Sequence, residues 1–178
     1  RAALARALGG RRFDLVLLGD VLIRAGTSWR PRVTEPVLAD RALADARRRL
    51  EQALSAGRPV REVLVDLGRA LRALPRRRIG SGDFVRVRLT GQFFASTTDG
   101  DGGYRLVRWL EERGARVEPP AVAEWLSYLA WQAASDDDSE PARRRHGARL
   151  GAALAARYRT YARAAGAEPA GLPDMEVL

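Results

Sequence analysis

Apolar residues recur at helical spacing through the first half of the chain. From Val37 to about Ala56 the alanines and leucines fall on one stripe, which Gly57 would end, and a second stripe follows up to Pro75. Each stripe is long enough for an amphipathic helix. The sequence therefore predicts an inserted helical hairpin over residues 37–75.

The same period recurs towards both ends of the chain. Residues 1–8, "RAALARAL", are typical of the tail of a helix closed by two glycines. A further helix is expected in "VAEWLSYLAWQ", before the acidic run at residues 136–138. A long last helix is expected within residues 139–166, where Leu150, Leu154 and Tyr158 share one face.

Three short segments have the apolar pattern of strands. The run at residues 13–18, "FDLVLL", is continuous, as in a strand covered on both faces, and an irregular loop with Pro31 and Pro36 is expected after it. "FVRVRLT" at 84–90 alternates, and "ARVEPP" at 115–120 follows a short helix that ends at Gly114. Strand, helix and strand at this spacing predict a right-handed βαβ unit with parallel strands.

We therefore expect an α/β fold: a Rossmann-like open parallel sheet with few strands, rich in helix. About three strands are fewer than the usual five or six of a sheet. The chain also begins with Arg1 rather than Met. Both observations predict that residues 1–178 are one partial α/β domain, a fragment of a larger protein.

Composition changes this picture in two respects. The net charge of +9 would suggest nucleic acid, but all 31 basic residues are arginine with no lysine, a bias that explains much of the charge, so nucleic acid is not an expected partner. The chain has no cysteine, which excludes disulfides, thiolate catalysis and a self-contained iron–sulfur site. A reducing, cytoplasmic location is expected, and no apolar run approaches a membrane span.

One loop carries the candidate chemistry. Residues 91–104, "GQFFASTTDGDGGY", follow the second strand, and ligands of open α/β sheets bind at the carboxyl ends of strands. The loop lacks the third glycine of a dinucleotide fingerprint, where Arg105 stands, and the glutamate that would end a calcium loop, where Leu110 stands. Two interpretations stay open: a ligand site, or a turn in which Asp101 caps the following helix.

The stretch from residue 88 to 132, "RLTGQFFASTTDGDGGYRLVRWLEERGARVEPPAVAEWLSYLAWQ", resembles a signature of proteins related to 2-hydroxyacyl-CoA dehydratases and acyl-CoA dehydratase activases, the 2-hydroxyglutaryl-CoA dehydratase-like family. "LLGDVLIRAGTSWRPRVTEP" upstream and "GLPDMEVL" downstream are similar to further family segments. The resemblance covers nearly all of residues 13–178. It implies that the family's cysteine-bearing part precedes Arg1 and that a glycine-rich part follows Leu178.

The resemblance implies a dehydratase-like scaffold of Rossmann-type domains. Relatives bind a 4Fe–4S cluster through cysteines and work with an ATP-hydrolysing activase on a 2-hydroxyacyl-CoA. For this chain it implies three partners, namely the remainder of its own polypeptide, such an activase and an acyl-CoA. The cluster would belong to the full-length protein, with no cofactor held within this chain. The ligand-loop candidates are Gly91, Gln92, Thr97, Thr98, Asp99, Gly100, Asp101, Gly102, Tyr104 and, upstream, Arg30.

Several positions depart from the family pattern. Gln92 replaces a glutamate, Gly103 an asparagine, and Arg32 and Val33 stand in place of a tyrosine and a glutamate. The loss of two carboxylates removes capacity for base catalysis or metal binding. The alternative function is therefore a degenerate, non-catalytic scaffold or partner-binding domain of the same fold. The single histidine, His146, lies in an arginine-rich helix start and is expected at the surface.

Overall fold

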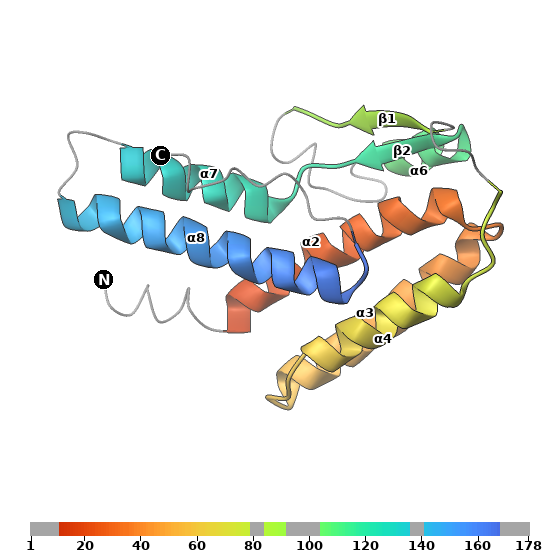
Figure 1. Cartoon of the computed structure of the whole chain (residues 1–178), viewed down its shortest axis with the longest axis horizontal. Coiled ribbons are helices and arrows are strands. Elements are labelled where there is room, and N and C mark those ends of the chain that lie inside the picture. Colours follow the sequence, from red (N-terminus) through yellow and green to blue (C-terminus); the bar gives the residue numbers. More distant parts are fainter. Residues whose placement is uncertain (1–10, 79–83, 92–103, 136–140, 168–178) are drawn as a thin grey trace.

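The computed structural model describes residues 11–78, 84–91, 104–135 and 141–167, with the side chains of residues 11–13 left out. Its elements are mostly helices (Figure 1). In chain order they are α2 (Arg11–Trp29), η1 (Arg30–Arg32), α3 (Pro36–Ser55), α4 (Arg61–Ala73), β1 (Val85–Arg88), α6 (Leu106–Glu112), β2 (Ala115–Glu118), α7 (Val122–Ser135) and α8 (Pro141–Ala164).

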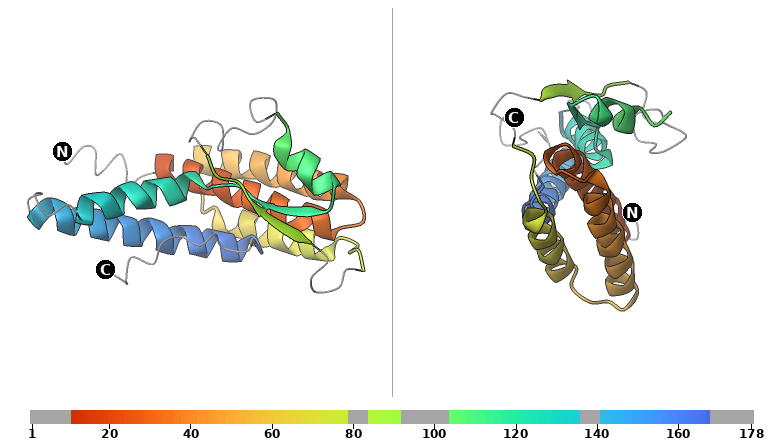
Figure 2. Two further views of the ribbon diagram at one scale, coloured as in Figure 1. Left: turned by 90° about the horizontal axis from the view of Figure 1, so that it is seen from above. Right: turned by 90° about the vertical axis from the view of Figure 1, so that its right-hand side faces the viewer.

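Helix α2 is the centre of the fold. It packs against α3, α7, α8 and β2, while α3 and α4 form a hairpin that reaches α8 through α4 (Figures 1 and 2). Leu17 and Val21 of α2 are fully buried, together with Leu64 of α4 and Tyr158 of α8. These side chains form one continuous core, because the apolar stripes of most described helices face inward and pack against one another.

The segment at residues 13–18 is helical, so the predicted strand is wrong. The predicted loop after it is also wrong in its first part, because α2 continues to Trp29 and the chain then makes one 3₁₀ turn. The buried residues of α2 include Leu17, Val21 and Ala25, which recur every four residues. A short apolar run fits a buried helix as well as a buried strand, and here the run continues at helical period past Gly19.

The other predicted helices and strands in the described residues are confirmed. Helices α3, α4, α6, α7 and α8 lie where the periodicity indicates them, and β1 and β2 pair in parallel with Val85 opposite Ala115. The described sheet has two strands, with α2 and α6 both packed against β2. The fold is therefore helix-rich with a small parallel sheet, broadly α/β. The expected helix at residues 1–8 lies outside the described residues.

Several side chains tie the C-terminal helix to the rest of the fold. Trp29 Nε1 of α2 donates a hydrogen bond to the carbonyl oxygen of Gly166 at 3.1 Å, and the Tyr161 hydroxyl donates to Asp14 Oδ1 at 3.0 Å. Burial, followed by the negative charge of Asp14, raises the pKa of Tyr161, so this hydroxyl stays protonated and remains a donor. No helix in the described residues has both the length and the apolar character needed to cross a membrane.

The hairpin of α7 and α8 depends on close backbone contact at Gly147. A Cβ atom at this position would lie 2.7 Å from the carbonyl oxygen of Ala130 and 3.1 Å from the backbone nitrogen of Ala134. Real Cβ contacts are essentially never shorter than 3.0 Å, and neither of these backbone atoms can rotate away. The two helices can therefore approach to this distance only because position 147 has no side chain.

Replacing Gly147 with alanine should destabilise the protein. Overpacking costs about 1–3 kcal/mol, and the better helix propensity of alanine returns up to about 1 kcal/mol, so we expect a net loss of about 1–2 kcal/mol in urea unfolding. Gly19→Ala is the matched control, because a Cβ there meets no atom within 4 Å. The Gly19→Ala substitution should be neutral or should raise the free energy of unfolding. Equal effects of the two substitutions would contradict the prediction.

Candidate functional site

The candidate loop lies in the chain between β1 and α6 of the parallel unit β1–α6–β2. Gly91 follows the carboxyl end of β1, and Tyr104 and Arg105 lead into α6. Gly91 has a φ of 153°, which side-chain-bearing residues rarely adopt. The other loop candidates, Gln92, Thr97, Thr98, Asp99, Gly100, Asp101 and Gly102, lie outside the described residues, and their role stays a prediction.

The backbone is strained where the loop enters α6. Tyr104 and Arg105 have φ values of 53° and 52°, in the left-handed region that residues with a Cβ seldom occupy. Tyr104 is 93% exposed, so no packing of its own side chain compensates for this conformation. Such strain persists only where the surrounding structure imposes it. The contacts that position α6 therefore contribute to the conformation of this junction.

The main such contact is the ion pair of Arg30 and Glu111. Arg30 Nε and Nη2 donate to the two carboxylate oxygens of Glu111 at 2.7 and 2.9 Å, and both side chains are largely buried, at 11% and 6% exposure. A bidentate arginine–carboxylate pair fixes both distance and orientation. It joins α6 to η1, the turn that follows α2. Arg30, expected to be a ligand-loop residue, thus holds the helix that follows the loop.

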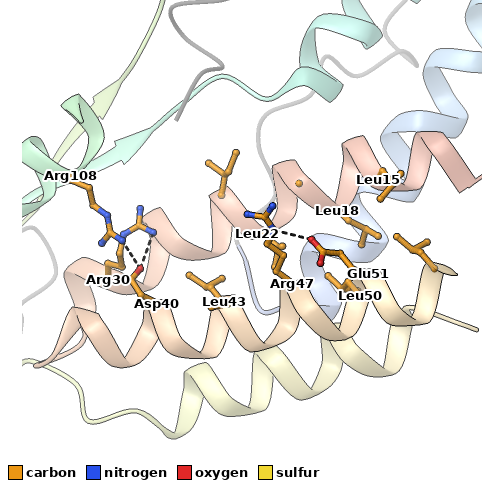
Figure 3. Close-up of a pocket in the computed structure, with 14 residues that line it drawn as sticks. Leu15, Leu18, Leu22, Arg30, Asp40, Leu43, Arg47, Leu50, Glu51 and Arg108 are labelled. Atoms are coloured by element: carbon orange, nitrogen blue, oxygen red, sulfur yellow. Dashed lines mark hydrogen bonds and ion pairs between the residues drawn. The ribbon is translucent and has the colours of Figure 1, made fainter. Parts of the chain in front are cut away.

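Asp40 and Arg108 extend this pair into a four-residue cluster. Asp40 Oδ1 accepts a hydrogen bond from Arg108 Nη2 at 2.6 Å and lies 3.7 Å from Arg30 Nη1. Gly26 makes room for the cluster, because a Cβ there would lie 2.2 Å from the same Arg30 nitrogen. The cluster joins η1, α3 and α6 and has two positive and two negative groups. Figure 3 shows its exposed side, where Arg30 and Arg108 converge on Asp40.

The buried carboxylate of Asp20 belongs to none of the sequence motifs. Its two oxygens accept the backbone N–H groups of Val122 at 3.0 Å and Ala123 at 2.7 Å, so a residue of α2 caps the first turn of α7. Burial raises the pKa of Asp20 to about 6, against the opposing effect of these two hydrogen bonds. The only sequence signal was an acidic residue at an inward position of an apolar helix.

A second, partly buried carboxylate lies at the end of β2. Glu118 accepts a hydrogen bond from Arg86 Nη2 at 2.6 Å and lies 3.7 Å from Arg24 Nη2. Burial works against ionisation of Glu118, but the bond from Arg86 and the charges of Arg24 and Arg116 outweigh it and lower the pKa. Glu118 is thus an anion at neutral pH. It joins β1 and β2 to α2 and is not available as a general acid.

A groove of about 580 Å³ runs between α2 and α3. Its floor is apolar, with Leu18 and Leu22 of α2 facing Leu50 of α3 (Figure 3). The Arg30–Asp40–Arg108 side of the ion cluster closes one end, and an exposed Arg47–Glu51 pair lies on the rim. The volume is in the range of small-molecule sites, but convergent polar groups are confined to that one end.

Other sequence candidates lie apart from this region. His146 is exposed on α8, as predicted. Three large aromatic residues lie at the surface, namely Trp109, Trp125 and Tyr128. Within the described residues, no group of three or more His, Cys, Asp or Glu side chains is arranged to hold a metal ion.

Comparison of the chain with protein-family models, with curated proteins and with solved structures finds no significant match.

Proposed function

We propose that this chain is the α/β scaffold of a larger cytoplasmic protein related to 2-hydroxyacyl-CoA dehydratases and their activases, with no complete active site of its own. The observation that carries the proposal is the parallel β1–α6–β2 unit, in which the motif loop follows the carboxyl end of β1. Ligands of open parallel sheets bind at this edge. In the proposed protein, further strands continue the sheet in a Rossmann-like arrangement.

The scaffold contributes geometry rather than reacting groups. Arg30 and Glu111 position α6, and α6 supports the strained Tyr104–Arg105 junction at which the loop ends. An iron–sulfur cluster does not fit the residues of this chain, because none of the 178 is a cysteine. Cysteines from another part of the polypeptide would hold the cluster, and an ATP-dependent activase would reduce it. An acyl-CoA would then meet the loop at the sheet edge.

A second candidate is a partner-binding scaffold without catalytic chemistry. The ion pair of Arg30 favours this second candidate. The sequence motif predicts that the Arg30 guanidinium binds a ligand, but it already binds the carboxylate of Glu111 and lies near that of Asp40. The loop sequence also contains Asp99 and Asp101, and a carboxylate about 4 Å from a phosphate would repel it by about 1–4 kcal/mol. The two candidates share a fold and differ in the presence of a cluster.

Anaerobic reconstitution of the full-length protein with iron and sulfide distinguishes the two candidates. We expect bound iron and sulfide in a ratio near one and an absorption and paramagnetic resonance signature of a 4Fe–4S cluster. Dehydration of a 2-hydroxyacyl-CoA, on addition of an activase and ATP, would follow. A correctly folded protein that binds no iron would contradict the dehydratase proposal and favour the scaffold without chemistry.

A further inference from the structure

Helix α8 differs from the other long helices in its charge. It has seven arginines and no aspartate or glutamate, whereas α3 and α4 together have seven arginines and five carboxylates. Four arginines of that hairpin form ion pairs, as in Arg47–Glu51 and Arg69–Asp66. A general bias towards arginine explains the number of arginines on α8 but not the absence of carboxylates. The charge of α8 therefore needs a separate explanation.

Four of these arginines form a stripe along the outer side of α8, which we call the arginine face. They are Arg145, Arg149, Arg159 and Arg163. At 3.6 residues per turn they fall within about 80° around the helix, on the side away from the buried Tyr158. Arg145, Arg149 and Arg163 are exposed and form no ion pair with any part of the chain that the structure describes. Since α8 runs along the edge of the molecule (Figure 1), this face is open to solvent.

Other arginines of α8 have different surroundings and are not part of the arginine face. Arg144 Nε donates to the carbonyl oxygen of Ala134 at 3.2 Å, and the acidic run at residues 136–138 precedes this turn in the sequence. Arg157 Nε lies 3.1 Å from Asp14 Oδ1 of α2. The arginine face is thus the part of α8 whose positive charge has no role in the described fold.

The spacing along the arginine face suits two parallel rows of negative charge. At 1.5 Å per residue, the two arginines of each end pair are about 6 Å apart, and about 15 Å separates Arg149 from Arg159. Ala152 and Ala156 lie between the two pairs on the same face and are exposed. The major groove of B-DNA is about 12 Å wide between its phosphate rows. Each pair can therefore contact one row, while the small alanines let the helix lie close to the duplex.

We propose that the arginine face of α8 binds double-stranded DNA, with the helix across the major groove and one arginine pair on each phosphate row. Guanidinium groups bind phosphate oxygens in a bidentate manner, and such contacts do not read the base sequence. Among the residues of α8, no exposed side chain is large and apolar, which argues against insertion into a membrane.

The placement of the arginines supports this partner where their number does not. The overall charge of +9 gave no reason to expect nucleic acid, because the arginine bias accounts for much of it. The inference goes beyond the proposed function and uses no residue of the motif loop.

Salt dependence of binding tests the phosphate contacts. Fluorescence anisotropy of a short labelled DNA duplex should give a plot of log association constant against log salt concentration with a slope of about −3.6 for four contacts. This slope corresponds to about a hundredfold loss of affinity between 50 and 200 mM salt. A slope near zero would overturn the proposal. Equal affinity for a single strand of the same length would also overturn it, because a single strand lacks the second phosphate row.

A triple variant tests the arginine face itself. It combines Arg145→Gln, Arg149→Gln and Arg163→Gln. All three side chains are exposed, so the variant should keep the circular dichroism spectrum of the wild type. Binding at 50 mM salt should weaken at least about tenfold, and the slope should become shallower by about three, one for each phosphate contact removed.

A matched variant controls for the total charge. It combines Arg47→Gln, Arg48→Gln and Arg69→Gln, which removes the same charge from exposed but paired positions on α3 and α4. Its affinity for the duplex should fall by less than about threefold, because salt screens charges far from the DNA. Equal weakening by the two triple variants would refute the arginine face. Tighter binding to phosphatidylserine vesicles than to the duplex at the same salt would assign the face to a membrane instead.

Discussion

Replacing Arg30 with alanine should lower the free energy of unfolding by about 3–5 kcal/mol, the range measured when one partner of a buried ion pair is removed. The carboxylate of Glu111 is 6% exposed and would lose both of its short hydrogen bonds. Arg108 lies 3.9 Å away but is already bonded to Asp40, so it compensates only in part. Urea unfolding followed by circular dichroism measures the loss.

Two controls separate burial from charge in this prediction. The double variant Arg30→Met and Glu111→Met should recover most of the stability, because two apolar side chains leave no buried charge unpaired. Arg48→Ala breaks an exposed pair with Asp45, and exposed pairs contribute about 0–1 kcal/mol. If Arg30→Ala proved no more destabilising than Arg48→Ala, the Arg30–Glu111 pair would not be what holds α6.

The Arg30 substitution should also alter the loop junction. Without the ion pair, α6 loses its polar link to η1, and the left-handed conformation of Tyr104 and Arg105 loses part of its support. Hydrogen exchange at the backbone amides of α6 should speed up more than exchange in α4, which follows the loss of global stability. Equal acceleration in both helices would show that the substitution acts through global stability alone.

The second large effect concerns pH and Asp20. Its pKa is about 6 in the folded protein and 3.8 in the reference state, so the folded state binds more protons between these values. Stability should therefore fall as the pH rises through this window, by about 3 kcal/mol for this one group. Burial is the main cause, the nearby charge of Glu124 adds to it, and the hydrogen bonds from Ala123 and Val122 oppose it.

Asp20→Asn isolates this contribution, because asparagine keeps an oxygen acceptor for the first turn of α7 and does not titrate. The difference in unfolding free energy between the wild type and this variant should favour the wild type most near pH 4. It should shift by up to about 3 kcal/mol towards the variant by pH 7. Measuring the difference removes titrations that both proteins share. A difference that stays constant with pH would show that Asp20 has an ordinary pKa.

Local periodicity was sufficient for helices with one clear apolar face and for the paired strands. The hairpin of α3 and α4 has such faces, with Pro36 at the start of α3 and Gly57 just after its end. Local periodicity failed for α2, because a central helix has almost no polar face and therefore resembles a buried strand over any short window. Residues 13–18 are apolar because of what surrounds α2, which is a property of the folded chain.

The candidate site shows the same division. The motif loop and its position between a strand and a helix were readable from the sequence, and β1 and α6 lie on either side of it. The pairing of Arg30 with Glu111 and the capping of α7 by Asp20 could not be predicted from the sequence. The first joins residues that are 81 positions apart in the chain, and the second joins residues that are 103 positions apart. Such contacts have no spacing rule, because the chain path between the two residues decides which side chains meet.

The sequence by itself determined which segments of this protein are amphipathic, where most of its described helices end, and that a glycine- and acid-rich loop follows a strand. Only the tertiary structure decided that α2 is a helix at the centre, that Arg30 pairs with Glu111 to position α6, and that an apolar groove lies between α2 and α3. The physical reason is that backbone periodicity is a local property, whereas burial and charge pairing depend on elements that meet only after the chain has folded.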